Sequence, residues 1–285
     1  MATLDDPLVS TEWLAAHLHD PGLRVIDASF KLPGAATSAR DDFLQAHIPG
    51  ATFFDVDAVA DRNDPLPHMY PDAEQFGDDV AALGISNDSI VVIYDSGSWM
   101  AAPRAWWMFL TFGHANVKIL DGGMKKWHAE GRATEAGEPH PVPGKYVATF
   151  NPAALRSKDQ MIRNLQSRAE QVIDARSRAR FEGSAAEPRP GLRAGHIPGS
   201  RNVPFSDLID PETAVMKPLP ELRTIFEKAG VDIEKPVVTS CGSGVSAGVL
   251  TLALYRLGGR GSALYDGSWS EWGLPDGPAI ATGPA

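Results

Sequence analysis

The sequence of 285 residues contains a single cysteine, Cys241. One cysteine excludes an internal disulfide and any metal site built from several cysteines. No segment approaches the roughly 18 consecutive apolar residues that a membrane helix requires. The start of the chain, "MATLDDPLVSTEWL", has neither the basic segment nor the apolar stretch of a secretion signal, and it is too acidic for a transit peptide. We therefore expect a cytoplasmic protein with no membrane partner.

Positive charge is also scarce. The chain has 26 lysines and arginines against 36 aspartates and glutamates, which gives a formal net charge of -10. A surface of this sign repels nucleic acids and anionic lipids, so we expect no nucleic-acid partner. The length and the 43% hydrophobic content allow either one large domain or two ordinary domains with proper cores.

Four short motifs occur twice, in the same order, at an offset of about 147 residues. The pairs are "VIDA" at 25–28 and 172–175, "AHIPGA" at 46–51 with "GHIPGS" at 195–200, "VVIYD" at 91–95 with "VVTSC" at 237–241, and "DGGMKKW" at 121–127 with "DGSWSEW" at 266–272. Such an ordered series indicates that the chain contains two copies of one domain-sized unit.

Within each copy, short runs rich in β-branched residues alternate with longer helical patterns. The runs predict buried strands at 23–28, 89–95, 118–123, 171–175, 235–241 and 262–268. The segments 102–113 and 246–259 are apolar on nearly every side and end at glycine, which predicts buried helices. Strands that alternate with helices favour a mostly parallel sheet covered by helices on both faces. The predicted fold class is therefore α/β, with two tandem domains.

The domain boundaries follow from the repeat and from one stretch of biased composition. Residues 135–144, "EAGEPHPVPG", are rich in proline and glycine and are typical of a linker. We predict domain 1 at 1–134, a linker at 135–156 and domain 2 at 157–285.

The repeat also separates structural residues from candidates for chemistry. His47 and His196 occupy the two "HIPG" turns, and Asp27 and Asp174 end equivalent strands, so these residues are interpreted as structural. Cys241 is different, because its counterpart in the first copy is Asp95. Ligands of open α/β sheets usually bind at the carboxyl ends of strands. Domain 2 is therefore the predicted catalytic domain and domain 1 the non-catalytic one.

The sequence around Cys241 favours a nucleophilic cysteine over an inert buried one. The glycines and serines of "CGSGVS" permit a loop whose backbone N–H groups point inward, and a helix begins near Ser246. Such surroundings lower the pKa of a thiol and produce the reactive thiolate. A cysteine phosphatase would have an arginine at position 247, where this chain has Ala247. A cysteine hydrolase stays open at this point, although it would not explain the duplication.

The tandem units, the "HIPG" turns, the "DGG"/"DGSW" motifs and the single cysteine loop together resemble the two-domain rhodanese-like sulfurtransferases. The loop "CGSGVS" is similar to the "CGSGVT" loop of the 3-mercaptopyruvate type and unlike the "CRKGVT" loop of thiosulfate sulfurtransferases. Ser246 replaces the threonine that the family usually has, and it keeps the hydroxyl.

This resemblance implies an enzyme that moves sulfur from 3-mercaptopyruvate through a persulfide on Cys241 and releases pyruvate. The implied acceptor is a thiol, such as thioredoxin or a small thiol, or cyanide. The resemblance implies no cofactor and no metal.

The resemblance also implies roles for particular residues. Arg180 and Arg189 match the family's substrate-binding pair, and arginine suits a carboxylate because its planar fork bonds both oxygens. Substrate contacts are also implied for the loop residues that follow the cysteine: Gly242, Gly244, Val245 and Ser246. Asp57, His68 and Ser243 correspond to a Ser–His–Asp arrangement proposed for the family, which would handle protons beside Cys241.

Two alternatives remain at this stage. One is a thiosulfate:cyanide sulfurtransferase, which the absence of basic residues in the loop disfavours. The other is a non-enzymatic persulfide carrier or binding module, for which the two arginines would be unnecessary.

Overall fold

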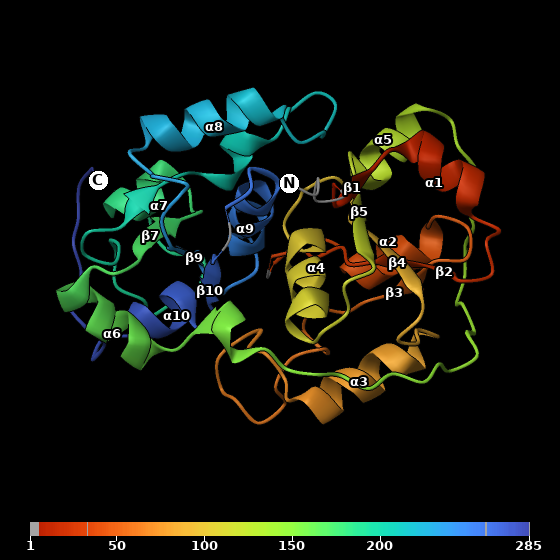
Figure 1. Cartoon of the computed structure of the whole chain (residues 1–285), viewed down its shortest axis with the longest axis horizontal. Coiled ribbons are helices and arrows are strands. Elements are labelled where there is room, and N and C mark those ends of the chain that lie inside the picture. The colour runs from red at the N-terminus through yellow and green to blue at the C-terminus, as the bar shows by residue number, and fades with distance from the viewer. Residues whose placement is uncertain (1–5, 33, 260, 285) are drawn as a thin grey trace. The chain divides into compact units, whose positions relative to one another are not determined.

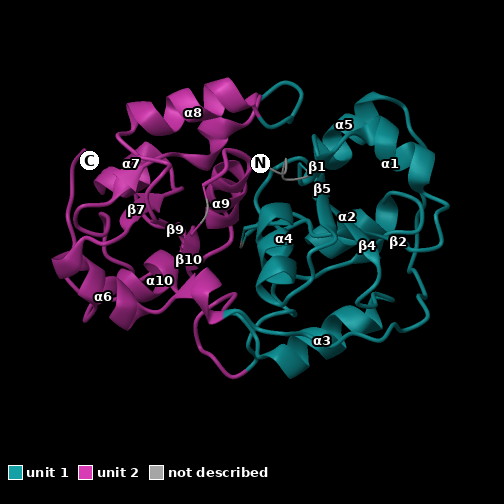
Figure 2. Ribbon diagram, in the orientation of Figure 1, with its two compact units in different colours: residues 1–62, 70–151, 211–216 teal, residues 63–69, 152–210, 217–285 magenta. Residues whose placement is uncertain are grey.

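The computed structural model describes residues 6–32, 34–259 and 261–284. Contacts between residues divide the chain into two compact units, which Figure 2 colours separately. Unit 1 comprises Met1–Arg62, Tyr70–Asn151 and Pro211–Met216, and unit 2 comprises Asn63–Met69, Pro152–Asp210 and Lys217–Ala285. Each unit therefore includes one short segment whose neighbours in the sequence belong to the other. The boundaries 1–134, 135–156 and 157–285 stay a prediction.

Unit 1 is built from strands that alternate with helices (Figure 1). In chain order these are β1 (Leu8–Val9), α1 (Thr11–His17), β2 (Leu23–Asp27), α2 (Ala39–Gln45), β3 (Thr52–Phe53), α3 (Ala73–Ala82), β4 (Ile90–Tyr94), α4 (Ala102–Thr111), β5 (Val117–Leu120) and α5 (Gly123–Ala129). The strands form a parallel sheet in the order β1-β5-β4-β2-β3.

Unit 2 repeats this plan. Its elements are η1 (Pro152–Ala154), β6 (Leu155–Arg156), α6 (Lys158–Ser167), β7 (Gln171–Asp174), α7 (Arg178–Glu182), β8 (Arg201–Asn202), η2 (Phe205–Leu208), α8 (Leu219–Lys228), β9 (Val237–Ser240), α9 (Ala247–Arg256), β10 (Ala263–Tyr265) and α10 (Ser268–Trp272). The order of its parallel strands, β6-β10-β9-β7-β8, is that of unit 1. The predicted duplication and α/β fold class are confirmed.

Helices cover both faces of each sheet, as predicted. In unit 1, Leu14 of α1, Phe43 of α2 and Trp127 of α5 pack on one face. The aromatic rings of Phe76 in α3 and Phe109 in α4 meet edge to face at 5.4 Å on the other. In unit 2, α6 and α10 share one core cluster with β7 and β9, whereas α9 contacts η2. All six strands predicted from the sequence are present.

The helix that follows each central strand is buried, also as predicted. In α9 every residue from Ala247 to Leu254 is buried, and in α4 the buried residues include Trp106 and Arg104. A helix that is apolar on nearly every side has no polar face that could be exposed to water, so it lies in the interior. This burial fixes the N-terminus of α9 against the end of β9.

The two "HIPG" histidines have the structural role expected of them. Nδ1 of His47 lies 2.8 Å from the Phe43 carbonyl, and Nδ1 of His196 lies 2.8 Å from the Phe181 carbonyl. Each ring also stacks on the phenylalanine to which it is bonded. Among the described residues, no helix combines the length and apolar character needed to span a bilayer.

Candidate active site

Cys241 directly follows β9, at the carboxyl end of the central strand of unit 2. Its side chain is buried, with 2% of the residue exposed. Residues 241–246 form a loop that leads into α9, and Gly244 adopts a left-handed backbone with φ of 74°. Glycine takes this conformation without steric strain, which lets the chain turn sharply from strand to helix.

The start of α10 binds the carbonyl groups of this loop. The Cys241 carbonyl accepts from the Trp269 N–H at 3.0 Å, and the Gly242 carbonyl accepts from the Ser270 N–H at 2.7 Å. The C=O and N–H of a trans peptide point in opposite directions. The N–H groups of Gly242 and Ser243 are therefore directed away from α10, in the manner of an anion-binding nest.

Unit 1 shows what the equivalent loop does with an anion. Asp95 directly follows β4, and its buried carboxylate accepts from the N–H groups of Gly97 at 2.8 Å, Trp99 at 3.3 Å and Ala102 at 3.5 Å. Burial raises the pKa of Asp95, and these backbone N–H groups oppose the rise. A loop after the central strand can therefore surround a negative charge with backbone donors.

Arg180 lies against the cysteine loop. Its Nη2 atom is 3.0 Å from the position that a Cβ on Gly242 would occupy. Glu187 orients the guanidinium, because its carboxylate accepts from Arg180 Nε at 3.3 Å and from Nη2 at 2.5 Å. Glu187 also accepts from Arg176 at 2.7 Å, and Arg176 in turn pairs with Asp174. The structure thus places one of the two predicted arginines beside Cys241.

Arg189 contacts another residue of the predicted site. Its Nη2 lies 3.1 Å from Nε2 of His68, and both residues belong to unit 2 although they are 121 positions apart. His68 is buried and has a positive φ of 62°, a conformation that residues other than glycine rarely adopt.

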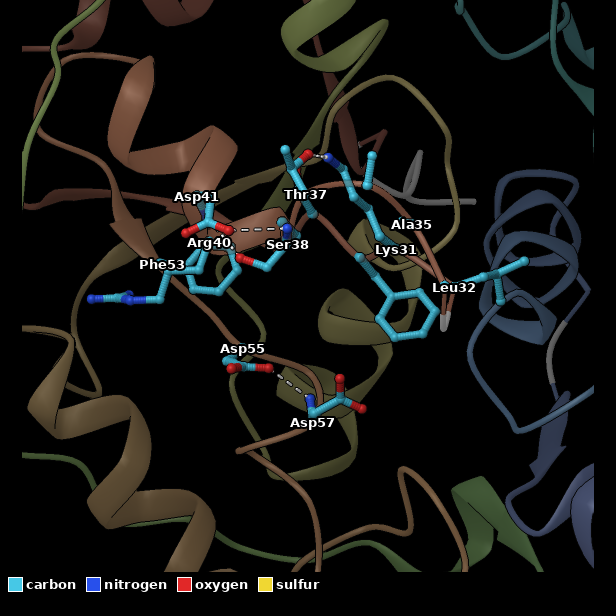
Figure 3. Close-up of a pocket in the computed structure, with 15 residues that line it drawn as sticks. Lys31, Leu32, Ala35, Thr37, Ser38, Arg40, Asp41, Phe53, Asp55 and Asp57 are labelled. Atoms are coloured by element: carbon cyan, nitrogen blue, oxygen red, sulfur yellow. Dashed lines mark hydrogen bonds between the residues drawn. The ribbon is translucent and has the colours of Figure 1, made fainter. Parts of the chain in front are cut away.

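The remaining predicted residues are divided between the units. Ser243, Val245 and Ser246 lie in the cysteine loop of unit 2, and Ser243 is buried. Asp57 belongs to unit 1, where its backbone N–H donates to the Asp55 carboxylate at 2.9 Å. Figure 3 shows Asp57 at the edge of a cavity of about 330 Å³ that residues of unit 1 line.

Sequence reasoning missed Glu187, which orients Arg180, and Ser268, whose hydroxyl accepts from the Cys241 N–H. The signal for Ser268 was present in the repeat, because "DGSWSEW" has serine where "DGGMKKW" has its second glycine. Glu187 carries no comparable signal. Within the described residues, no group of three or more histidine, cysteine, aspartate and glutamate side chains is arranged to hold a metal ion.

Comparison with known proteins identifies the family. The sequence matches the Rhodanese-like domain at residues 10–130 and again at 157–274. It is 43% identical over 266 residues to the 3-mercaptopyruvate sulfurtransferase of Escherichia coli K12, covering 93% of this chain and 94% of that one. It is also 43% identical over 273 residues to a thiosulfate sulfurtransferase of Rattus norvegicus, covering 93% of this chain and 91% of the relative.

A solved structure agrees in fold over nearly the same span. The crystal structure of SseA, a 3-mercaptopyruvate sulfotransferase from Escherichia coli, superposes with a TM-score of 0.85 at 41% identity, covering 94% of this chain and all of that one. The duplicated sheets, the paired family matches and these relatives converge on one conclusion. The chain belongs to the family of two-domain rhodanese-like sulfurtransferases.

Proposed function

We propose that the protein is a 3-mercaptopyruvate sulfurtransferase whose nucleophile is Cys241. The observation that carries this proposal is the Arg180 guanidinium, which lies against Gly242 and therefore one residue from Cys241. A thiol in a loop of backbone donors, with a cation beside it, suits a small anionic sulfur donor. The relatives named 3-mercaptopyruvate sulfurtransferase support the same substrate.

The reaction has two covalent steps. The Cys241 thiolate attacks the sulfur of 3-mercaptopyruvate, an S–S bond forms and the C–S bond breaks. The electron pair of that bond leaves with the carbon fragment as the enolate of pyruvate, which then takes up a proton. An acceptor attacks the outer sulfur of the Cys241 persulfide and carries it away, which regenerates the thiolate.

The loop and Arg180 divide the negative charge of the reactants between them. We assign the transferred sulfur to the N–H groups of Gly242 and Ser243, which point away from α10, and to the N-terminus of α9. Arg180 binds the substrate carboxylate, with Glu187 holding its guanidinium in one orientation. Arg189 supplies the second cationic group. The loop residues Gly244, Val245 and Ser246 shape the contact with the substrate.

The proton for the enolate is assigned to the group of Ser243, His68 and Asp57. Ser243 lies two residues from Cys241 and is buried, which supports a role for its hydroxyl in polarising the departing carbonyl. The roles of His68 as the base and of Asp57 as the residue that orients it rest on the resemblance to the family alone. The acceptor is a thiol, either a small molecule or a protein such as thioredoxin, or cyanide. We place the protein in the cytoplasm.

Initial rates with two donors test the proposal. We expect 3-mercaptopyruvate to be strongly preferred over thiosulfate, with one pyruvate released for each sulfur transferred. The variant Cys241→Ser should lose turnover of both donors while its unfolding transition stays near that of the natural protein. Absence of turnover with either donor in the natural protein would favour a carrier or binding module instead.

Thiosulfate:cyanide sulfur transfer is the second candidate, because a relative of equal identity is a thiosulfate sulfurtransferase. Thiosulfate is a dianion without a carboxylate, and the segment from Gly242 to Ser246 contains no basic side chain to hold it. The same two-donor assay separates the candidates. A higher kcat/KM for thiosulfate would show that the neutral loop does not select the donor.

A further inference from the structure

Ser268, the first residue of α10, contacts the backbone of the cysteine itself. We infer that Ser268 is a positioning residue for sulfur transfer: its hydroxyl fixes the backbone of Cys241 and thereby the direction of the thiol. This inference deepens the proposed function and rests on it only for the identity of the sulfur donor.

The Ser268 hydroxyl has a defined set of partners. It donates to the Tyr265 carbonyl at 2.8 Å and accepts from the Cys241 N–H at 3.1 Å. Ser240, the last residue of β9, donates to the same oxygen at 3.4 Å. Ser268 is completely buried, so no water competes for these bonds. Because the single proton is committed to Tyr265, the oxygen lone pairs remain directed toward β9 and Cys241.

Cys241 is consequently held at both of its backbone polar groups. Its N–H donates to the Ser268 hydroxyl, and its carbonyl accepts from the N–H of Trp269, the next residue of α10. Two bonds to one rigid turn fix the peptide planes on either side of the Cys241 Cα. They therefore fix the Cα–Cβ bond along which the sulfur is presented.

The backbone conformation of Ser268 is unfavourable for a serine. Its φ is 47°, in the left-handed region that disfavours residues with a Cβ. The equivalent residue of unit 1 is Gly123, with φ of 53°, and a Cβ there would lie 2.5 Å from the Asp95 carbonyl. The copy with the cysteine thus keeps a strained serine where the other copy has glycine. Strain that persists in one of two equivalent sites indicates that the side chain is needed there.

The Ser268 hydroxyl is needed beside a nucleophile and not beside the aspartate of unit 1. In unit 1 the Asp95 side chain is itself held by backbone N–H groups, so its direction is set without a serine. A thiolate must instead point at a substrate sulfur that is present only transiently. Misplacement of a reacting atom by about 1 Å can lower a rate roughly a hundredfold. A hydroxyl that fixes the backbone of Cys241 therefore acts on kcat without touching the substrate.

Two substitutions separate the hydroxyl from the strain. Ser268→Gly installs the residue that unit 1 already has at this position, and it removes both the hydroxyl and the disfavoured Cβ. Ser268→Ala removes the hydroxyl and keeps the Cβ. The control is Ser270→Ala. The Ser270 hydroxyl donates to the Gly242 carbonyl at 2.8 Å, and this carbonyl keeps its second bond, from the Ser270 N–H, when the hydroxyl is removed. For each protein, kcat and KM for 3-mercaptopyruvate, the rate of thiol alkylation by iodoacetamide and Tm are measured.

We expect kcat to fall by about tenfold to a hundredfold in both Ser268 variants, with KM within about threefold of the natural value. The alkylation rate should change in both, Tm should fall further in Ser268→Ala than in Ser268→Gly because only the alanine keeps the disfavoured Cβ, and Ser270→Ala should resemble the natural protein. Natural kcat and alkylation rate in Ser268→Gly would overturn the inference, as would a loss of kcat that follows Tm or a rise in KM alone. Alkylation requires no sulfur donor. If the natural protein fails to turn over 3-mercaptopyruvate, that result refutes the proposed function, and the alkylation rates still decide the role of Ser268.

Discussion

An aspartate ends β2 in unit 1 and β7 in unit 2, but the two carboxylates have different hydrogen-bond partners. This difference predicts that replacing each aspartate by asparagine has opposite effects on stability. Asp27 in unit 1 accepts from the Ser29 N–H at 2.7 Å. Asp174 in unit 2 instead pairs with the Arg176 guanidinium, at 2.6 Å between Nη2 and Oδ2. We expect Asp27→Asn to stabilise the protein at pH 7 and Asp174→Asn to destabilise it.

The magnitude for Asp27 follows from its pKa. Burial raises the pKa of Asp27 from 3.8 to about 6, and the hydrogen bonds from Ser29 and Tyr94 only partly oppose the rise. Between these values the folded state binds more protons than the unfolded state, so stability falls as the pH rises. The full loss above pH 6 is about 3 kcal/mol, since each pKa unit corresponds to about 1.4 kcal/mol. Asparagine cannot ionise and keeps an oxygen for the Ser29 N–H, so the variant escapes this loss.

The assay is urea unfolding at several pH values between 4.5 and 7.5, with tryptophan fluorescence as the readout. The difference in unfolding free energy between Asp27→Asn and the natural protein should increase by about 2 kcal/mol between pH 4.5 and 7.5, because about 1 kcal/mol of the loss occurs below pH 4.5. An offset that does not vary with pH reports the altered hydrogen bond with Tyr94 and is separate from the prediction. Asp174→Asn should lose about 3 kcal/mol or more at pH 7, because it leaves the charge of Arg176 buried with fewer partners. A pH-independent difference for Asp27→Asn would refute the argument that its burial in the charged form is unfavourable.

Two further predictions concern the loops that follow the central strands. Arg180→Ala and Arg189→Ala should each raise KM for 3-mercaptopyruvate by more than about tenfold, equivalent to about 1.4 kcal/mol, in steady-state kinetics; unchanged KM in both would remove them from the site. Asp95→Ala leaves the N–H groups of Gly97 and Trp99 without their carboxylate, so urea unfolding should show a loss of about 2 kcal/mol, with kcat unchanged. A large fall in kcat in this variant would contradict the assignment of catalysis to unit 2.

Much of the fold could be predicted from the sequence because its signals are local. The central strands β4 and β9 are continuous apolar runs, as strands buried on both faces must be, and α4 and α9 are apolar on nearly every side. The edge strands, such as β3 and β8, have only two residues each and leave no period to detect. Their existence follows from pairing with a neighbour, which local sequence does not encode.

The site was predictable where chemistry is concentrated in one motif and not where it depends on contacts between distant residues. Cys241 was predicted as the nucleophile from its own loop and Arg180 as a substrate contact from the resemblance to the family, and both roles stay predictions. The bond from Glu187 to Arg180 and the bond from Cys241 to Ser268 exist only after the chain has folded. Asp57 lies in unit 1, so its role beside His68 stays a prediction.

The two loops suggest how one copy of a duplicated fold can specialise. In unit 1, the carboxylate of Asp95 itself accepts from the backbone N–H groups of its own loop. In both units the carbonyl of the first loop residue accepts from the following helix, from the Met124 N–H in unit 1 and from the Trp269 N–H in unit 2. In unit 2, however, Cys241 has no carboxylate, and its N–H donates to the Ser268 hydroxyl. Cys241 thus brings no carboxylate to the backbone donors of its own loop, and the Ser268 hydroxyl supports the backbone of the loop instead. The replacement of aspartate by cysteine is therefore insufficient by itself, because the loop also requires the serine that unit 1 lacks.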